Sequence, residues 1–204
     1  IAGTIQPWKG QREVIQAVRR VKEKVPDIQC LIVGGAYDSQ YYTDIKNLTE
    51  ELGLVENVRF LGYRTDVLNV MNAMDIVIHA STSPEPFGMV LIEAMVLGKP
   101  VIATRAGGPL EIIEDQVSGL FVSPGDPDAL AEAITRLLSD RSVAAEMGRS
   151  ARKRIGQMFP LKRTIEEIKN LYGDLNCFRT LSAIHAWRAA GLYGGRVCCI
   201  TANP

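Results

Sequence analysis

Two carboxylates and a glycine, spaced over nine residues, form the part of this chain best suited to chemistry. Glu85 lies between two prolines, which fix the backbone φ and keep the loop extended. Gly88 follows and permits close backbone approach where a helix is expected to begin. Glu93 lies five residues beyond Gly88, about 7.5 Å further along a helix axis. The two carboxylates should therefore flank the start of a helix.

The start of this helix is expected to offer hydrogen-bond donors to a ligand. First-turn N–H groups have no intrahelical partner, and the helix dipole favours anions at that end. These groups belong to Phe87, Gly88, Met89 and Val90. A ligand with phosphates in the middle and hydroxyl-bearing sugars at each end would match such donors flanked by carboxylates.

Short β-branched runs alternate along the chain with longer amphipathic runs, which predicts strands and helices in turn. The expected strands are 1–5, 28–33, 58–61, 76–80, 100–104 and 119–122. The expected helices are 11–25, 41–52, 67–74, 88–97, 109–114, 128–138, 142–158 and 161–172. Six strands, each followed by a helix, predict an α/β fold with a doubly wound, parallel, Rossmann-like sheet in the order 3-2-1-4-5-6.

This topology predicts where a ligand should bind. In such sheets, ligands bind beyond the carboxyl ends of the strands, at the switch point between the first and fourth strands. The loop 6–10 follows the first strand and the loop 81–88 follows the fourth. Lys9 lies in the first of these loops, where an ammonium group suits a phosphate. The crevice between the two loops is therefore the predicted site.

Several sequence motifs follow one another along the chain. Glu85 and Glu93 form E-x7-E, which is followed by AMVLGKPVIAT, GGPLE and SGLFVSPGD; GTIQPWKG and RFLGYRTDV lie upstream. From Ile1 to about Tyr172, this arrangement resembles the donor-binding domain of the family 4, or group 1, glycosyltransferases. The resemblance implies one half of a GT-B architecture and retaining hexosyl transfer from a nucleotide-diphosphate sugar. It also implies an N-terminal acceptor-binding domain that is absent from this chain.

The resemblance implies roles for individual residues. Glu85 would bind hydroxyls of the donor sugar, Glu93 the ribose hydroxyls, and Lys9 the diphosphate leaving group. Lys9 and Glu85 are thus the expected catalytic residues. The other expected substrate-binding residues are Gly3, Thr4, Arg64, Phe87, Gly88, Met89 and Val90. With a lysine and a helix N-terminus on the leaving group, neither a metal ion nor a cofactor is expected.

Thr4 departs from the family pattern. The family usually carries an arginine directly after the glycine of the first strand, as a second cation for the phosphates, whereas Thr4 follows Gly3 here. A hydroxyl can donate a hydrogen bond but cannot neutralise charge, and a charge-assisted contact contributes about 1.5–3 kcal/mol. Arg105 and Arg64 are the candidates to replace the missing cation.

Four other features have simpler explanations than a site. The DPD sequence at 126–128 could hold a metal, but an Asp N-cap followed by Pro at N1 explains it. The glycines at 34–35 suit a tight turn, and no G-x-G-x-x-G supports a nicotinamide cofactor. The glycines at 107–108 are predicted to form a turn, and its place beside the crevice also makes proximity to a substrate reasonable. His79 is expected to be a packed, hydrogen-bonded histidine.

The composition narrows the class of protein. Of 204 residues, 47% are hydrophobic, which supplies a core, while 23 basic and 23 acidic residues cancel. A formal net charge of zero argues against broad electrostatic capture of nucleic acid. No apolar run approaches the ~20 residues that cross a bilayer, and the four cysteines show no C-x-x-C or disulfide pattern. A cytoplasmic protein is expected, with peripheral membrane association left open for the full-length enzyme.

The chain is expected to contain one domain and a tail. Residues 1–173 are predicted to form the nucleotide-sugar-binding domain, and residues 174–204 lose the strand–helix alternation and hold three of the four cysteines. The chain begins within an expected strand, without an initiator methionine, which predicts a missing N-terminal part. Two alternatives to the donor-binding half of a transferase stay open: a non-catalytic nucleotide-sugar-binding module and a GT-B-fold nucleotide-sugar epimerase.

Overall fold

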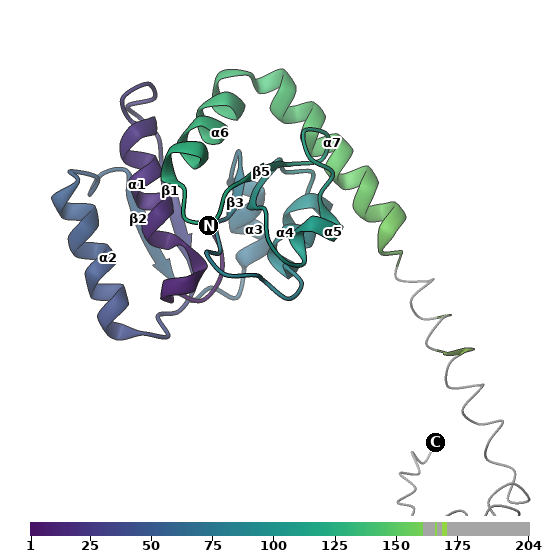
Figure 1. Cartoon of the computed structure of the whole chain (residues 1–204), viewed down its shortest axis with the longest axis horizontal. Coiled ribbons are helices and arrows are strands. Elements are labelled where there is room, and N and C mark those ends of the chain that lie inside the picture. Colours follow the sequence, from purple (N-terminus) through teal and green to yellow (C-terminus); the bar gives the residue numbers. More distant parts are fainter. Residues whose placement is uncertain (161–165, 167–168, 171–204) are drawn as a thin grey trace, which may run out of the picture. The chain divides into compact units, whose positions relative to one another are not determined.

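The computed structural model describes residues 1–160, 166, 169 and 170 of the chain (Figure 1). Ile1–Met158 form one compact unit, which holds every named helix and strand. The predicted tail at 174–204 lies outside the described residues, as does most of the predicted helix at 161–172. The domain boundary at 173 therefore stays a prediction.

Parallel strands form the centre of this unit in two groups. β1 (Cys30–Val33) pairs with β2 (Val58–Gly62). β4 (Val101–Thr104) lies between β3 (Val77–His79) and β5 (Leu120–Val122), and both of its pairings are parallel. All four residues of β4 are buried, as expected for a strand that is covered on both faces of a parallel sheet. The α/β class predicted from the sequence is confirmed.

The first predicted strand, residues 1–5, is held beside β1 by isolated bridges. Ala2 pairs with Val33, and Ile5 pairs with Ala36. The N–H of Gly3 donates to the Val33 carbonyl at 2.8 Å. The observed neighbours therefore follow the predicted order 3-2-1 in one group and 4-5-6 in the other. Within the described residues, five segments are named strands, and no strand ladder joins the two groups.

Helices pack against both faces of the strands. The helices are α1 (Gln11–Val21), α2 (Ser39–Glu51), α3 (Val67–Ala73), α4 (Met89–Val96), α5 (Pro109–Ile112), α6 (Pro127–Ser139) and α7 (Arg141–Met158), with a 3-10 turn, η1, at Pro7–Lys9. One core cluster includes side chains of α1, α2, α6 and the first part of α7, and a second includes side chains of α3, α4, α5 and the later part of α7. Ile102 belongs to the first cluster, whereas its neighbours Val101 and Ala103 belong to the second. Since side chains alternate between the faces of a strand, the two clusters lie on opposite sides of β4.

Local sequence signals explain where several helices begin and end. The Asp126 carboxylate accepts hydrogen bonds from the N–H groups of Asp128 and Ala129, so the DPD sequence is a helix cap, as expected. The α1 helix ends at Val21 rather than at the predicted Val25. Val25 precedes Pro26, and a residue before proline avoids helical backbone angles.

Two negative findings apply to the described part of the chain. None of its helices is long and apolar enough to cross a membrane. No group of three or more His, Cys, Asp or Glu side chains within it is arranged to hold a metal ion.

The position of Ile102 between two covering layers generates a prediction about stability. Ile102 is fully buried, so Ile102→Ala should lower the free energy of unfolding by about 2–5 kcal/mol through lost burial and a residual cavity. Val117→Ala is the control, because Val117 is 47% exposed and a surface change should stay within about 0.5 kcal/mol. Urea denaturation measures both. Equal losses in the two variants would show that β4 is not the centre of the core.

Candidate functional site

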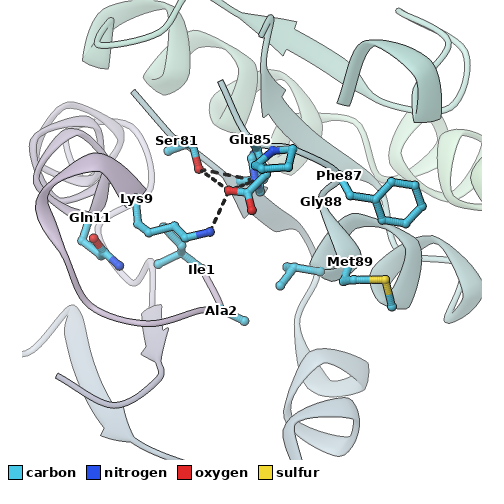
Figure 2. Close-up of a pocket in the computed structure, with 13 residues that line it drawn as sticks. Ile1, Ala2, Lys9, Gln11, Ser81, Glu85, Phe87, Gly88 and Met89 are labelled. Carbon is cyan, nitrogen blue, oxygen red and sulfur yellow. Dashed lines mark hydrogen bonds and ion pairs between the residues drawn. The ribbon is translucent and has the colours of Figure 1, made fainter. Parts of the chain in front are cut away.

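A pocket of about 310 Å³ lies at the predicted switch point (Figure 2). Three segments surround it: the first two residues, the end of η1 with the start of α1, and the stretch from β3 to the start of α4. The lining residues are Ile1, Ala2, Lys9, Gln11, His79, Ala80, Ser81, Glu85, Pro86, Phe87, Gly88, Met89 and Val90. The two loops expected to face each other therefore do so.

Close backbone approach brings these two loops together. Gly10 has a left-handed φ of 74°, and a Cβ at this position would lie 2.6 Å from the carbonyl carbon of Ala80. The N–H of Thr82 donates to the carbonyl of Trp8 at 2.8 Å. The loop after the first segment is thus fixed against the loop after β3 by main-chain contacts, independently of the charged side chains.

Lys9 and Glu85 form an ion pair across the pocket. Lys9 Nζ lies 2.7 Å from Glu85 Oε2, and the two side chains retain 19% and 15% of their exposure (Figure 2). Lys9 Nζ also lies 4.0 Å from the centroid of the Trp8 ring. A partly buried pair is screened less than a surface pair. In this structure, the two residues predicted to be catalytic therefore contact each other.

The surroundings of Glu85 favour its charged form. Burial pushes the pKa of Glu85 upward, but the hydrogen bond and charge of Lys9, with smaller contributions from His79 and Ser81, outweigh burial and hold that pKa below its usual value. Ser81 Oγ donates to Glu85 Oε2 at 3.2 Å. Glu85 is therefore an ionised acceptor at neutral pH, which suits it to bind hydroxyl groups rather than to donate a proton.

His79 lies beneath this carboxylate. Its side chain is only 6% exposed, and its Nε2 lies 3.4 Å from Glu85 Oε2 and 3.4 Å from Ser81 Oγ. Burial lowers the pKa of His79, and although Glu85 acts in the opposite direction, the net shift is downward. The imidazole is therefore neutral at pH 7. Its Nδ1 is buried and has no hydrogen-bond partner among the described residues, so His79 is packed as predicted but only partly hydrogen-bonded.

The α4 helix begins at the edge of the pocket. Gly88 precedes it with a left-handed φ of 97°, and no side chain caps it. The N–H groups of Gly88, Met89 and Val90 make no hydrogen bond to other elements within the described residues. The pocket thus contains amide donors at the positive end of a helix dipole, close to the predicted helix start.

Four predicted binding residues do not line this pocket: Gly3, Thr4, Arg64 and Glu93. Thr4 is exposed, and its hydroxyl accepts a hydrogen bond from Gln6 at 2.9 Å. Glu93 is half-buried on α4, beyond the first turn that reaches the pocket. The structure therefore brings together the loop residues and the helix start, but not these four.

The two arginines considered as replacements for the missing cation are engaged elsewhere. Arg64 donates hydrogen bonds of 2.7 and 2.6 Å to the two carboxylate oxygens of Asp66. Arg105 pairs with Asp115, and its guanidinium carbon lies 4.8 Å from the centroid of the Phe121 ring. Neither arginine lines the pocket, and among the described residues Lys9 is the one lining side chain with a full positive charge.

Sequence reasoning missed Gln11, and it placed Ser81 in the loop 81–88 without giving it a role. Gln11 is 1% exposed; its Nε2 donates to the Thr4 carbonyl at 3.0 Å, while its Oε1 is buried without a partner. A signal was available, because Gln11 shares the spacing of the buried Val14, Ile15 and Val18 on α1. A polar side chain on an apolar helix face indicates a special environment. No comparable signal marked Ser81.

Comparison with known proteins identifies a family. Residues 1–154 match the family described as "Glycosyl transferases group 1". The D-inositol 3-phosphate glycosyltransferase of Corynebacterium glutamicum is 35% identical over 178 residues, which cover 84% of this chain and 42% of that protein. This chain therefore spans less than half the length of such relatives.

Solved structures agree with this match. Anabaena HepE in complex with UDP-glucose superimposes with a TM-score of 0.79 at 35% identity, over 85% of this chain and 48% of that one. The C-terminal domain of a group 1 family protein, LpcC from Francisella tularensis, superimposes with a TM-score of 0.72 at 27% identity, over 78% of this chain and 83% of that one. The chain belongs to the group 1 glycosyltransferases and corresponds to their C-terminal, GT-B-type domain.

Proposed function

We propose that this chain binds the nucleotide-sugar donor of a retaining, metal-independent hexosyltransferase. The observation that carries the proposal is the meeting of Lys9 and Glu85 beside the start of α4. One pocket thereby combines a cation, amide donors and an ionised carboxylate. The UDP and UDP-glucose complexes of the structural relative HepE support a nucleotide sugar as the ligand. Retention is the usual outcome in this family.

The charges in the pocket match the parts of such a donor. Negative charge develops on the diphosphate as the sugar leaves, and preorganised cations and N–H groups stabilise it. Lys9 and the amide of Val90 would supply that stabilisation. Glu85 accepts but cannot donate hydrogen bonds when ionised, so it would bind sugar hydroxyls. The residues that act on the leaving group thus differ from the residue that acts on the sugar.

The Lys9–Glu85 ion pair implies an exchange of partners on binding. A diphosphate would compete with Glu85 for the ammonium group of Lys9. Sugar hydroxyls would then give Glu85 new donors in place of Lys9. A complete nucleotide sugar would give both residues a new partner in place of their ion pair. A free nucleoside diphosphate would give a new partner only to Lys9.

A non-catalytic nucleotide-sugar-binding module is the second candidate for the chain by itself. The observation in its favour is the match to only 42% of the length of a relative, since acceptor binding would require further protein. Donor hydrolysis by this chain, alone and joined to an upstream domain, separates the two functions. Hydrolysis that requires the upstream domain would favour the transferase.

Binding without a metal ion is the direct test of the proposed site. A chelator should change neither the affinity for UDP nor the affinity for UDP-glucose, as measured by calorimetry. Lys9→Met should weaken UDP about ten- to hundred-fold, since a charge-assisted contact is lost. Lys46→Met is the control, because Lys46 contacts Tyr42 on α2 rather than the pocket. Binding abolished by the chelator would overturn the metal-independent mechanism.

The two carboxylates of E-x7-E should bind different parts of the donor, Glu93 the ribose and Glu85 the transferred sugar. Glu93→Ala should weaken UDP itself about ten- to hundred-fold through loss of a charged hydrogen bond to the ribose. Glu85→Ala should not weaken UDP, because the substitution also releases Lys9 for the diphosphate, and it should reduce the affinity for UDP-glucose. Glu132→Ala, an exposed position on α6, serves as the control. Equal loss of UDP in the Glu85 and Glu93 variants would contradict this division.

A further inference from the structure

We propose that Gly107 and Gly108 are positioning residues that set the place of Glu85 in the pocket. These two glycines lie between β4 and α5, and we call them the glycine shelf. Neither lines the pocket. They act through the backbone of the loop that carries Glu85. The effect on donor binding rests on the proposed function, whereas the effect on Glu85 itself does not.

Backbone contacts join the shelf directly to Glu85. Gly107 and Glu85 form an isolated parallel bridge, and the Gly108 N–H donates to the Glu85 carbonyl at 2.7 Å. A Cβ on Gly107 would lie 2.8 Å from the Glu85 nitrogen and closer still to its carbonyl oxygen. The Cβ atoms of real residues essentially never lie within 3.0 Å of non-bonded heavy atoms. Any side chain at 107 would therefore displace the main chain of Glu85.

Gly108 shows that these glycines do more than form a turn. Gly107 has a left-handed φ of 66°, which a turn alone would explain. Gly108 has φ −52° and ψ −34°, an ordinary conformation for any residue. A Cβ on Gly108 would nevertheless lie 2.5 Å from the carbonyl oxygen of Phe87 and 2.6 Å from its Cα. Close approach, rather than backbone conformation, thus requires glycine at 108.

The position of this loop matters because Glu85 is held on its other side by short contacts. Its Oε2 lies 2.7 Å from Lys9 Nζ and 3.2 Å from Ser81 Oγ. Ser81 is itself fixed, since its carbonyl accepts a hydrogen bond from the buried Thr104 hydroxyl at 2.8 Å. The donor–acceptor distances of hydrogen bonds to a carboxylate vary by only a few tenths of an ångström. A methyl group on the shelf should therefore separate Glu85 from Lys9.

The first test follows the ionisation of Glu85 in the ligand-free protein by carbon-13 NMR. Lys9 holds the pKa of Glu85 below its usual value, so Gly108→Ala should raise that pKa, as should Lys9→Met. The control is Gly156→Ala on α7, where an added Cβ meets nothing within 4 Å. A folded Gly108→Ala protein whose Glu85 titrates as in the wild type would overturn the proposal.

A second pair of variants separates positioning from backbone strain. Gly107 and Gly125 have similar left-handed φ values of 66° and 71°, but a Cβ at 125 would meet no atom of the described residues within 4 Å. Both alanine variants bear the same strain, and only Gly107→Ala should move the pKa of Glu85. Should both shelf variants fail to fold while Gly125→Ala folds, the shelf would determine stability rather than position, and the proposal would be wrong.

Ligand binding provides the functional readout. In Gly108→Ala, the affinity for UDP-glucose relative to that for UDP should fall about ten- to hundred-fold, on the scale of a lost charged hydrogen bond. An unchanged ratio would contradict the role in donor binding. If the wild-type protein binds neither ligand, the proposed function fails, while the titration of Glu85 still decides whether the shelf positions it.

Discussion

The ion pair between Lys9 and Glu85 is the interaction on which the candidate site depends. Its partners lie 76 positions apart in the chain, in the loop after residues 1–5 and in the loop after β3. Main-chain contacts between Gly10 and Ala80 and between Trp8 and Thr82 bring the loops close enough for the pair to form. The long side chain of Lys9 is ordered by Trp8 and Glu85 together.

Under the proposed function, a chain of zero net charge must hold an anionic ligand. The protein has no general field to attract phosphates, so a local arrangement must supply the attraction. Lys9 and the amides at the start of α4 would do so, while Glu85 offsets part of their charge. A pocket of this kind would discriminate against simple anions, because binding one would leave Glu85 without its cation. Ligands that combine phosphate with hydroxyl groups avoid that penalty.

Support for Glu85 extends to residues that do not line the pocket, namely Thr104 and the glycine shelf. Thr104 holds Ser81, Ser81 holds the carboxylate, and the glycine shelf holds the main chain. These residues lie at the end of β4 or just after β3 or β4, which are adjacent strands paired in parallel. The strand pairing that builds the core thus also positions the groups around Glu85. The chain that carries this site belongs to the group 1 glycosyltransferases.

The sequence by itself determined the features that depend on near neighbours in the chain. Strand and helix alternation, the Asp126 cap and the helix start after Gly88 all follow from local periodicity and backbone preference, and the parallel α/β class follows from them. The loops that carry Lys9 and Glu85 were placed by topology alone. The tertiary structure decided which groups touch: Lys9 with Glu85, Arg105 with Asp115, and Gly108 with Phe87. These contacts depend on differences of an ångström or less between distant segments, which a one-dimensional pattern does not contain.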